Sequence, residues 1–125
     1  MKIHSLLTFL CFLFFFPVFS QEKVHVEDSY RVEELNRLGY EIRLTDPEQS
    51  ISYAEKGLDL AKKLKNKKGT GEAHRVMGIG YSYLGQNTKA ISNYLISLSH
   101  FKEAGHLEGQ AKVYNNIGNL YLDID

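Results

Sequence analysis

Apolar residues recur at steps of three and four from about residue 31 onward, the spacing that places them on one face of a helix. The successive stripes are Val32, Leu35, Leu38 and Ile42; Ile51, Ala54, Leu58, Ala61 and Leu64; Met77, Tyr81 and Leu84; Ile91, Tyr94, Leu98 and Phe101; and Val113, Ile117, Leu120 and Tyr121. No stretch shows a sustained alternation of two residues, which a half-buried strand would need. The pattern predicts an all-α chain.

Polar residues, proline and glycine mark where these helices begin and end. Asp46 can cap a helix that Pro47 opens, because the missing N–H of proline does no harm at a first helical position. Gly85 and Gly105 follow two of the stripes and can adopt the left-handed conformation that stops a helix. The last helix is expected from about 108 to 122.

Two sequence matches indicate an internal repeat with one period. The pairs Leu38-Gly39, Met77-Gly78 and Ile117-Gly118 place an aliphatic residue before a glycine, at spacings of 39 and 40. The segment 50–54 aligns with 90–94, again at a spacing of 40. Glycine inside a helix costs about 1 kcal/mol relative to alanine. Its recurrence at one phase predicts that a paired helix packs close to the backbone there.

These residues resemble the tetratricopeptide repeat family, in its branch with longer repeats. The second unit matches best, with Met77, Gly78, Tyr81, Gly85, Ala90, Tyr94 and Ser97 at the family's positions. The resemblance implies antiparallel helix pairs stacked as a right-handed superhelix, about two and a half repeats long. The units are expected at 31–68, 71–104 and 108–125, the last one incomplete. The residues beyond the usual repeat length are expected between repeats, near Lys65–Gly69 and Ala104–Glu108.

The resemblance also implies a function, because family members bind peptides on the concave side of the superhelix. The chain is therefore expected to act as a non-catalytic module that binds a peptide or protein segment. The family's groove positions, carried onto this sequence, are Asn36, Tyr40, Arg43, Arg75, Ile79, Tyr83, Lys112, Asn115 and Asn119. The arrangement is similar to exported N-terminal sensor regions of Bacteroidetes-type regulators, so the sensory half of a membrane-bound signalling protein is the alternative.

The segment 1–20 is of a different kind from the rest of the chain. Lys2 precedes an almost unbroken apolar run over 6–16, and Ser20 supplies a small residue before the polar residues 21–23. This is the layout of a secretory signal peptide with cleavage after Ser20. The sequence predicts an exported protein, periplasmic or secreted, with an uncleaved N-terminal anchor as the alternative. Residues 21–30 are expected to form a linker.

Composition narrows the chemistry that the exported part can perform. Fifteen Lys and Arg balance fifteen Asp and Glu, so net charge gives no reason to expect nucleic-acid binding. The single Cys lies at position 11, and no His, Asp or Glu spacing is typical of a metal site. No catalytic set can be identified, so neither an enzyme nor a cofactor is predicted. The basic run 62–68 is interpreted as a helix end, where cations suit the helix dipole, with a lipid or nucleic-acid patch as the alternative.

The last predicted helix has no helix after it to pair with. Its stripe of Val113, Ile117, Leu120 and Tyr121 is expected to be partly bare. Each large apolar side chain left in water forfeits about 1.5–3 kcal/mol. The chain is therefore expected to be a truncated form of a longer repeat protein, with self-association through the open C-terminal edge as the alternative.

Overall fold

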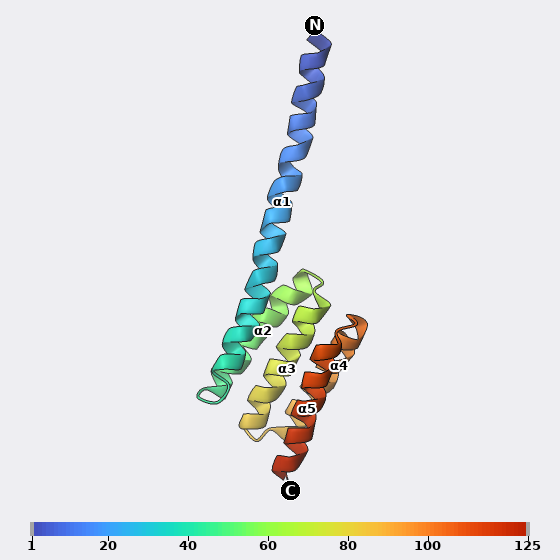
Figure 1. The fold of residues 1–125 in the computed structure, drawn as a ribbon. Coiled ribbons are helices and arrows are strands. Elements are labelled where there is room, and N and C mark those ends of the chain that lie inside the picture. The colour runs from blue at the N-terminus through green and yellow to red at the C-terminus, as the bar shows by residue number, and fades with distance from the viewer. Residues whose placement is uncertain (1, 125) are drawn as a thin grey trace.

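The computed structural model describes the backbone of residues 2–124 and the side chains of residues 20–123. Five helices follow one another along the chain: α1 (Lys2–Glu41), α2 (Pro47–Lys63), α3 (Lys67–Tyr83), α4 (Asn87–Glu103) and α5 (Leu107–Ile124) (Figure 1). The described part of the chain contains no strand. The predicted all-α class is confirmed.

The last four helices follow a strict spacing. They begin at Pro47, Lys67, Asn87 and Leu107, which are evenly spaced, and α2, α3 and α4 are each 17 residues long. Only three residues separate each of these helices from the next, so two successive helices account for one sequence repeat. The expectation that the extra residues lie between repeats is wrong, because they lengthen the helices. The second unit accordingly starts at Lys67 rather than at 71.

Local hydrogen bonds explain where the helices start and stop. The Asp46 side chain accepts from the backbone N–H of Gln49 at 3.0 Å, and Pro47 is the first helical residue, as predicted. Asn66 caps α3 in the same way, which is why that helix opens earlier than expected. Gly85 and Gly105 take φ values of 71° and 64° just after α3 and α4, as predicted for helix-terminating glycines.

Residues 21–30 are helical, in contrast to the linker expected there. They contain neither glycine nor proline, so nothing in the local sequence interrupts a helix that continues into the packed part of α1. The predicted signal peptide falls almost entirely on residues 1–19, whose side chains lie outside the described part of the chain. Within the described residues, no helix combines the length and apolar character required to cross a membrane.

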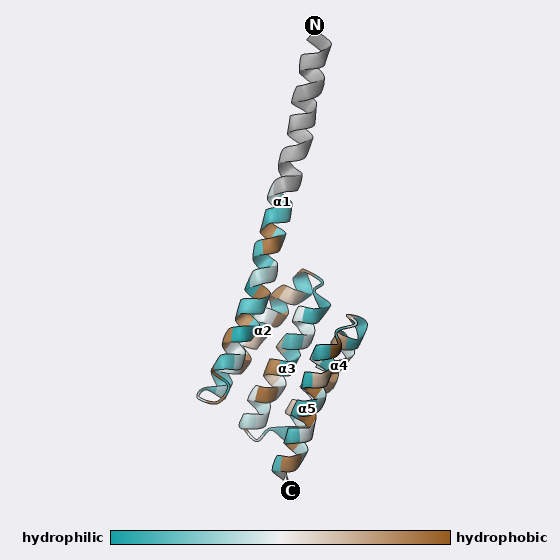
Figure 2. Cartoon of the chain, viewed as in Figure 1, coloured by the Kyte–Doolittle hydropathy of each residue, from teal (hydrophilic) through white to brown (hydrophobic). Residues whose placement is uncertain are grey.

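The helices form two layers. Each helix packs on the next one along the chain, and α3 also contacts both α1 and α5. The helices α1, α3 and α5 therefore share one side of the molecule, and α2 and α4 lie on the other (Figure 1). Hydrophilic and hydrophobic residues alternate along these helices (Figure 2). Stacking of this kind brings residues that are one repeat apart in the sequence side by side.

Two apolar clusters hold the layers together. One lies between α2 and α3 and contains Ile51, Ala54, Leu58, Ala73, Val76 and Met77. The other joins α3, α4 and α5 and contains Ile79, Ala90, Tyr94, Leu98, Phe101, Val113 and Leu120. Tyr81 packs against both clusters. The stripe on the last helix is partly bare, as expected, because Val113 and Leu120 are buried in this cluster whereas Tyr121 is 56% exposed.

The recurring glycines test the proposed repeat. A Cβ built on Gly78 would lie 2.6 Å from Tyr94 Cδ1 and 3.2 Å from the carbonyl oxygen of Ala90. At Gly39 it would lie 2.9 Å from the carbonyl oxygen of Ser50, the residue that aligns with Ala90 in the repeat. At both glycines the paired helix packs against the backbone through equivalent residues, as predicted. The prediction is wrong for Gly118, because no atom lies within 4 Å of a Cβ built there.

Candidate functional site

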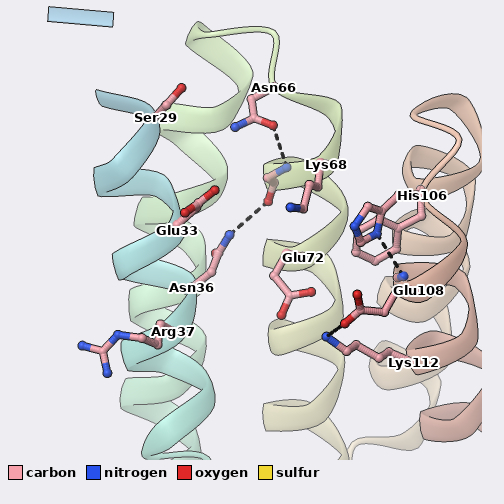
Figure 3. Close-up of a pocket in the computed structure, with 13 residues that line it drawn as sticks. Ser29, Glu33, Asn36, Arg37, Asn66, Lys68, Glu72, His106, Glu108 and Lys112 are labelled. Atoms are coloured by element: carbon pink, nitrogen blue, oxygen red, sulfur yellow. Dashed lines mark hydrogen bonds and ion pairs between the residues drawn. The ribbon is translucent and has the colours of Figure 1, made fainter. Parts of the chain in front are cut away.

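A groove of about 370 Å³ runs across the side of the molecule formed by α1, α3 and α5 (Figure 3). Polar and charged side chains make up most of its lining. The residues that line it are Ser29, Glu33, Asn36, Arg37, Asn66, Lys68, Gly69, Glu72, Phe101, His106, Glu108, Gly109 and Lys112. Three helices that are distant in the sequence therefore contribute to one concave surface.

Gly69, at the start of α3, is bonded both to α1 and to the N-cap residue of its own helix. Its carbonyl oxygen accepts a hydrogen bond from Asn36 Nδ2 of α1 at 3.1 Å, and its N–H donates to Asn66 Oδ1 at 2.8 Å. Asn36 is only 3% exposed, and its Oδ1 is the atom nearest to a Cβ built on Gly57. Asn36 thus bonds α1 to α3 through its Nδ2 and packs against Gly57 of α2, while its buried Oδ1 has no hydrogen-bond partner within the described residues.

His106 caps the start of α5, as Asn66 caps the start of α3. Its Nδ1 accepts a hydrogen bond from the N–H of Gly109 at 2.9 Å, so its proton resides on Nε2. The imidazole also stacks on Phe101, with ring centroids 5.4 Å apart. The starts of α3 and α5 are therefore both capped by side chains, and both helix starts lie at the same end of the groove. Figure 3 shows the side chains of both helix starts facing the same space.

The charged residues of the groove fall into paired and unpaired groups. Glu108 and Lys112 form an ion pair at 2.7 Å, whose hydrogen bond lowers the pKa of the Glu108 carboxyl. Arg37 binds Glu34 at 2.6 Å and also binds Glu41, and its guanidinium is directed away from the groove (Figure 3).

Two charged residues of the lining remain unpaired. Glu33 of α1 and Lys68 of α3 form no ion pair or side-chain hydrogen bond within the described residues, and both are exposed. The Glu33 carboxylate and the Lys68 ammonium therefore face the groove without an ion-pair partner and can interact with a ligand.

A second cluster connects the C-terminal end of α1 with the middle of α3 and of α5. Arg75 of α3 is 6% exposed, donates to Glu72 at 2.6 and 3.0 Å, and donates to Asn116 of α5 at 3.3 Å. Burial is the largest single effect and lowers the pKa of Arg75, but the hydrogen bond with Glu72 and the electrostatic effects of Glu72, Tyr40 and Tyr94 together outweigh it, so the pKa is raised. The Arg75 and Arg43 guanidiniums lie 5.1 and 3.8 Å from the ring centroid of Tyr40. This cation–π cluster ties α1 to α3.

The nine residues expected to bind a ligand therefore separate into groups. Asn36 and Lys112 line the groove, although Asn36 is already bonded and buried. Tyr40, Arg43 and Arg75 come together in the cation–π cluster. Tyr83, Asn115 and Asn119 are exposed but line neither feature.

Ile79 belongs to none of these groups. Its side chain is 5% exposed and packs in the cluster shared by α3, α4 and α5. Placing it in the binding surface was wrong, because its position on α3 faces the next helix pair rather than the groove.

The groove residues that sequence reasoning missed include Asn66, Lys68, His106 and Glu108. Asn66 and Lys68 lie in the basic run 62–68, which was interpreted as a helix end, with a lipid or nucleic-acid patch as the alternative. The signal was the spacing of Asn66 and His106, which equals one repeat and joins two residues that can each accept a hydrogen bond from the N–H three positions later. That spacing places two helix starts, with their polar side chains, next to each other.

The described part of the chain holds no group of three His, Cys, Asp or Glu side chains placed to bind a metal ion. Comparison with family models, with curated proteins and with solved structures found no match to this chain.

Proposed function

We propose that the chain is a non-catalytic binding module that holds a peptide or an extended protein segment in the groove across α1, α3 and α5. The observation that carries the proposal is the groove itself, which crosses three helices and is lined mainly by polar residues. A segment lying across such a surface contacts several helices at once, so its recognition depends on how the helices are stacked.

The unpaired groups of the groove suit a polypeptide ligand. Lys68 offers an ammonium group to a carboxylate or carbonyl oxygen, and Glu33 offers a carboxylate to a basic side chain or a backbone N–H. The Nδ2 of Asn66 makes no hydrogen bond within the described residues, since only its Oδ1 serves the cap. Donors and acceptors on facing helices match the alternating N–H and C=O groups of an extended backbone.

The stacking of the helices supports assigning the fold to the tetratricopeptide type. Helices α2 to α5 begin at an even spacing, and Gly39 and Gly78 make equivalent contacts one repeat apart. We propose that the array continues this stacking as a right-handed superhelix with the groove on its concave side. We place the binding activity outside the cytoplasm on the basis of the signal-like pattern at 1–20.

A charge-reversal experiment tests the proposal. The full chain is screened against an array of short random synthetic peptides, and the best binders are measured again with Lys68→Glu, Glu33→Lys and the double variant. We expect each single change to weaken the selected peptides by about tenfold, the loss of one charge-assisted contact. Lys63→Glu is the matched control, because Lys63 is equally exposed on α2 but does not line the groove.

Two results would contradict the proposal. One is an array in which no peptide binds better to the native chain than to the double variant. The other is a set of binders that Lys63→Glu weakens as much as Lys68→Glu does.

A further inference from the structure

The outward face of α5 is formed by four residues with a regular spacing: Ala111, Tyr114, Gly118 and Tyr121. All four are exposed, and the two tyrosines retain 53% and 56% of their accessible surface. Among the described residues α5 contacts only α3 and α4, both on its other sides. We call these four residues the α5 face. Leu122, beside the α5 face, is 75% exposed.

The α3 residues one repeat earlier show how such a face is covered. Gly71, His74, Gly78 and Tyr81 of α3 meet α4, which runs antiparallel to α3. The ring of Tyr94 lies on Gly78, and the ring of Phe101 lies 3.0 Å from a Cβ built on Gly71. Small residues of one helix therefore receive large residues of the other, and this alternation permits the close packing.

The α5 face alternates small and large residues in the order Ala, Tyr, Gly, Tyr, at steps of three, four and three. This spacing reads the same in both directions. If a second α5 lies antiparallel so that Tyr114 of one copy meets Gly118 of the other, then Ala111 also meets Tyr121 of the other copy. Every small residue then faces a tyrosine, which is the self-complementarity that a two-fold interface requires.

We propose that the α5 face binds the α5 face of a second copy of this chain, forming a symmetric antiparallel pair with Tyr114 of each copy on Gly118 of the other. The open backbone at Gly118 accepts the ring, because no atom lies within 4 Å of a Cβ built there. The pairing is separate from the peptide groove, which lies on the side of α5 that faces α1 and α3.

The size of the surface sets the expected strength of the pair. Two half-exposed tyrosines and Leu122 offer roughly 100 Å² each, so both copies together bury less than about 1,000 Å², which is the range of weak and reversible complexes. We therefore expect the full chain to dimerise in a concentration-dependent way rather than as a permanent dimer.

Sedimentation equilibrium of the full chain, with circular dichroism to confirm folding, tests the pairing. Gly118→Tyr is expected to raise the dimer dissociation constant by about tenfold or more, because two rings then meet where one ring met a glycine. The swap Tyr114→Gly with Gly118→Tyr restores a small residue opposite a large one and is expected to recover most of the affinity. Ser99→Leu, at an exposed position of α4, is the control for added apolar surface.

Residues 1–20 are common to every variant, so association through them cannot distinguish the variants. Loss of dimer in Gly118→Tyr, recovery in the swap and no loss in Ser99→Leu would support the pairing. A native chain that stays monomeric at every concentration would overturn it and leave the α5 face to a helix of another protein. A dimer that is insensitive to Gly118→Tyr, or a swap that fails to recover affinity while remaining folded, would also overturn it.

Discussion

Helices α3 and α5 carry the same sequence pattern in different surroundings. Both place an aliphatic residue before a glycine and a tyrosine three residues after that glycine. In α3 the glycine is buried under the ring of Tyr94, and the residues from 73 to 80 are all buried. In α5 the corresponding Gly118 is exposed, and only the opposite side of the helix, with Val113 and Leu120, is covered.

The difference shows that the repeat pattern determines the shape of the helix surface but not whether another helix covers that surface. Gly78 is required because a neighbouring helix occupies the space where a side chain would stand. Gly118 also destabilises its helix by about 1 kcal/mol relative to alanine. Within one copy, however, no neighbouring atom occupies the space where its side chain would stand. Substitutions at matched positions of the two helices can therefore measure what the covering helix contributes.

The largest effect is expected from removing the side chain that covers α3. Tyr94 is 2% exposed, and burial raises the pKa of its phenol to about 12. Tyr94→Ala should lower the free energy of unfolding by about 3–5 kcal/mol, because a buried aromatic is replaced by a cavity. Thermal melts followed by circular dichroism measure the loss. Tyr83→Ala is the control, since Tyr83 is 55% exposed, and an equal loss there would contradict the packing described for α4.

The next effect separates the two glycines directly. Gly78→Ala should destabilise the fold by about 1–3 kcal/mol, because its Cβ would lie 2.6 Å from the Tyr94 ring and the packed helices cannot separate freely. Gly118→Ala should stabilise the fold by up to about 1 kcal/mol, because nothing opposes the Cβ and alanine favours the helix. Urea unfolding of both variants at low protein concentration measures the contrast. Changes of the same sign would show that α3 and α5 do not differ as described.

Sequence reasoning found the parts of the fold that depend on local spacing. The apolar stripes, the cap at Asp46 and the helix stops at Gly85 and Gly105 follow from three- and four-residue steps and from single-residue conformational preferences. The lengths of the connections did not follow, because the segment Lys65–Gly69 was expected to lie between repeats. Its last three residues are helical, since Asn66 caps α3 just before them and Phe101 of α4 packs against Gly71 in the same helix.

The candidate site was less predictable, because its polar residues are placed by partners far along the chain. Asn36 and Arg75 look like exposed polar residues on a helix, yet Asn36 is bonded to Gly69 and Arg75 to Asn116. These bonds span 33 and 41 positions, close to one repeat, and no local pattern reveals them. The prediction for Ile79 was wrong for the same reason. The side of α3 that carries Ile79 is covered by α5, a helix that lies far along the chain.

A smaller change in the free energy of unfolding is expected from pH, through His74 of α3, which corresponds to Tyr114 of α5. Burial between α3 and α4 lowers the pKa of His74 below its usual 6.5, and the positive charges of His100 and Lys62 act in the same direction. Only the hydrogen bond with Asn93 opposes them. The unfolded chain therefore binds a proton more readily than the folded chain does at this residue.

The stability contributed by neutral His74 is complete above about pH 6.5 and is lost as the pH falls from there through the lowered folded pKa. We expect a decline of at most about 1.4 kcal/mol per pH unit for this one group. Urea unfolding between pH 7.5 and about 5 measures it, and the His74→Gln variant should show a flatter profile than the native chain. Equal slopes for the two proteins would show that His74 is not the group responsible.

The smallest effect concerns the turns that end α2, α3 and α4. Lys65, Gly85 and Gly105 occupy the same place in the three turns, with φ values of 53°, 71° and 64°. A lysine in this left-handed conformation is strained by its Cβ, whereas glycine is not. Lys65→Gly should therefore raise the free energy of unfolding by about 0.5–1 kcal/mol, and Gly85→Ala should lower it by about 1 kcal/mol. Because a Cβ built on Gly85 meets nothing within 4 Å, any loss there reports backbone conformation alone. Chemical unfolding of the two variants measures both changes, and a stabilising Gly85→Ala would show that the three turns are not equivalent.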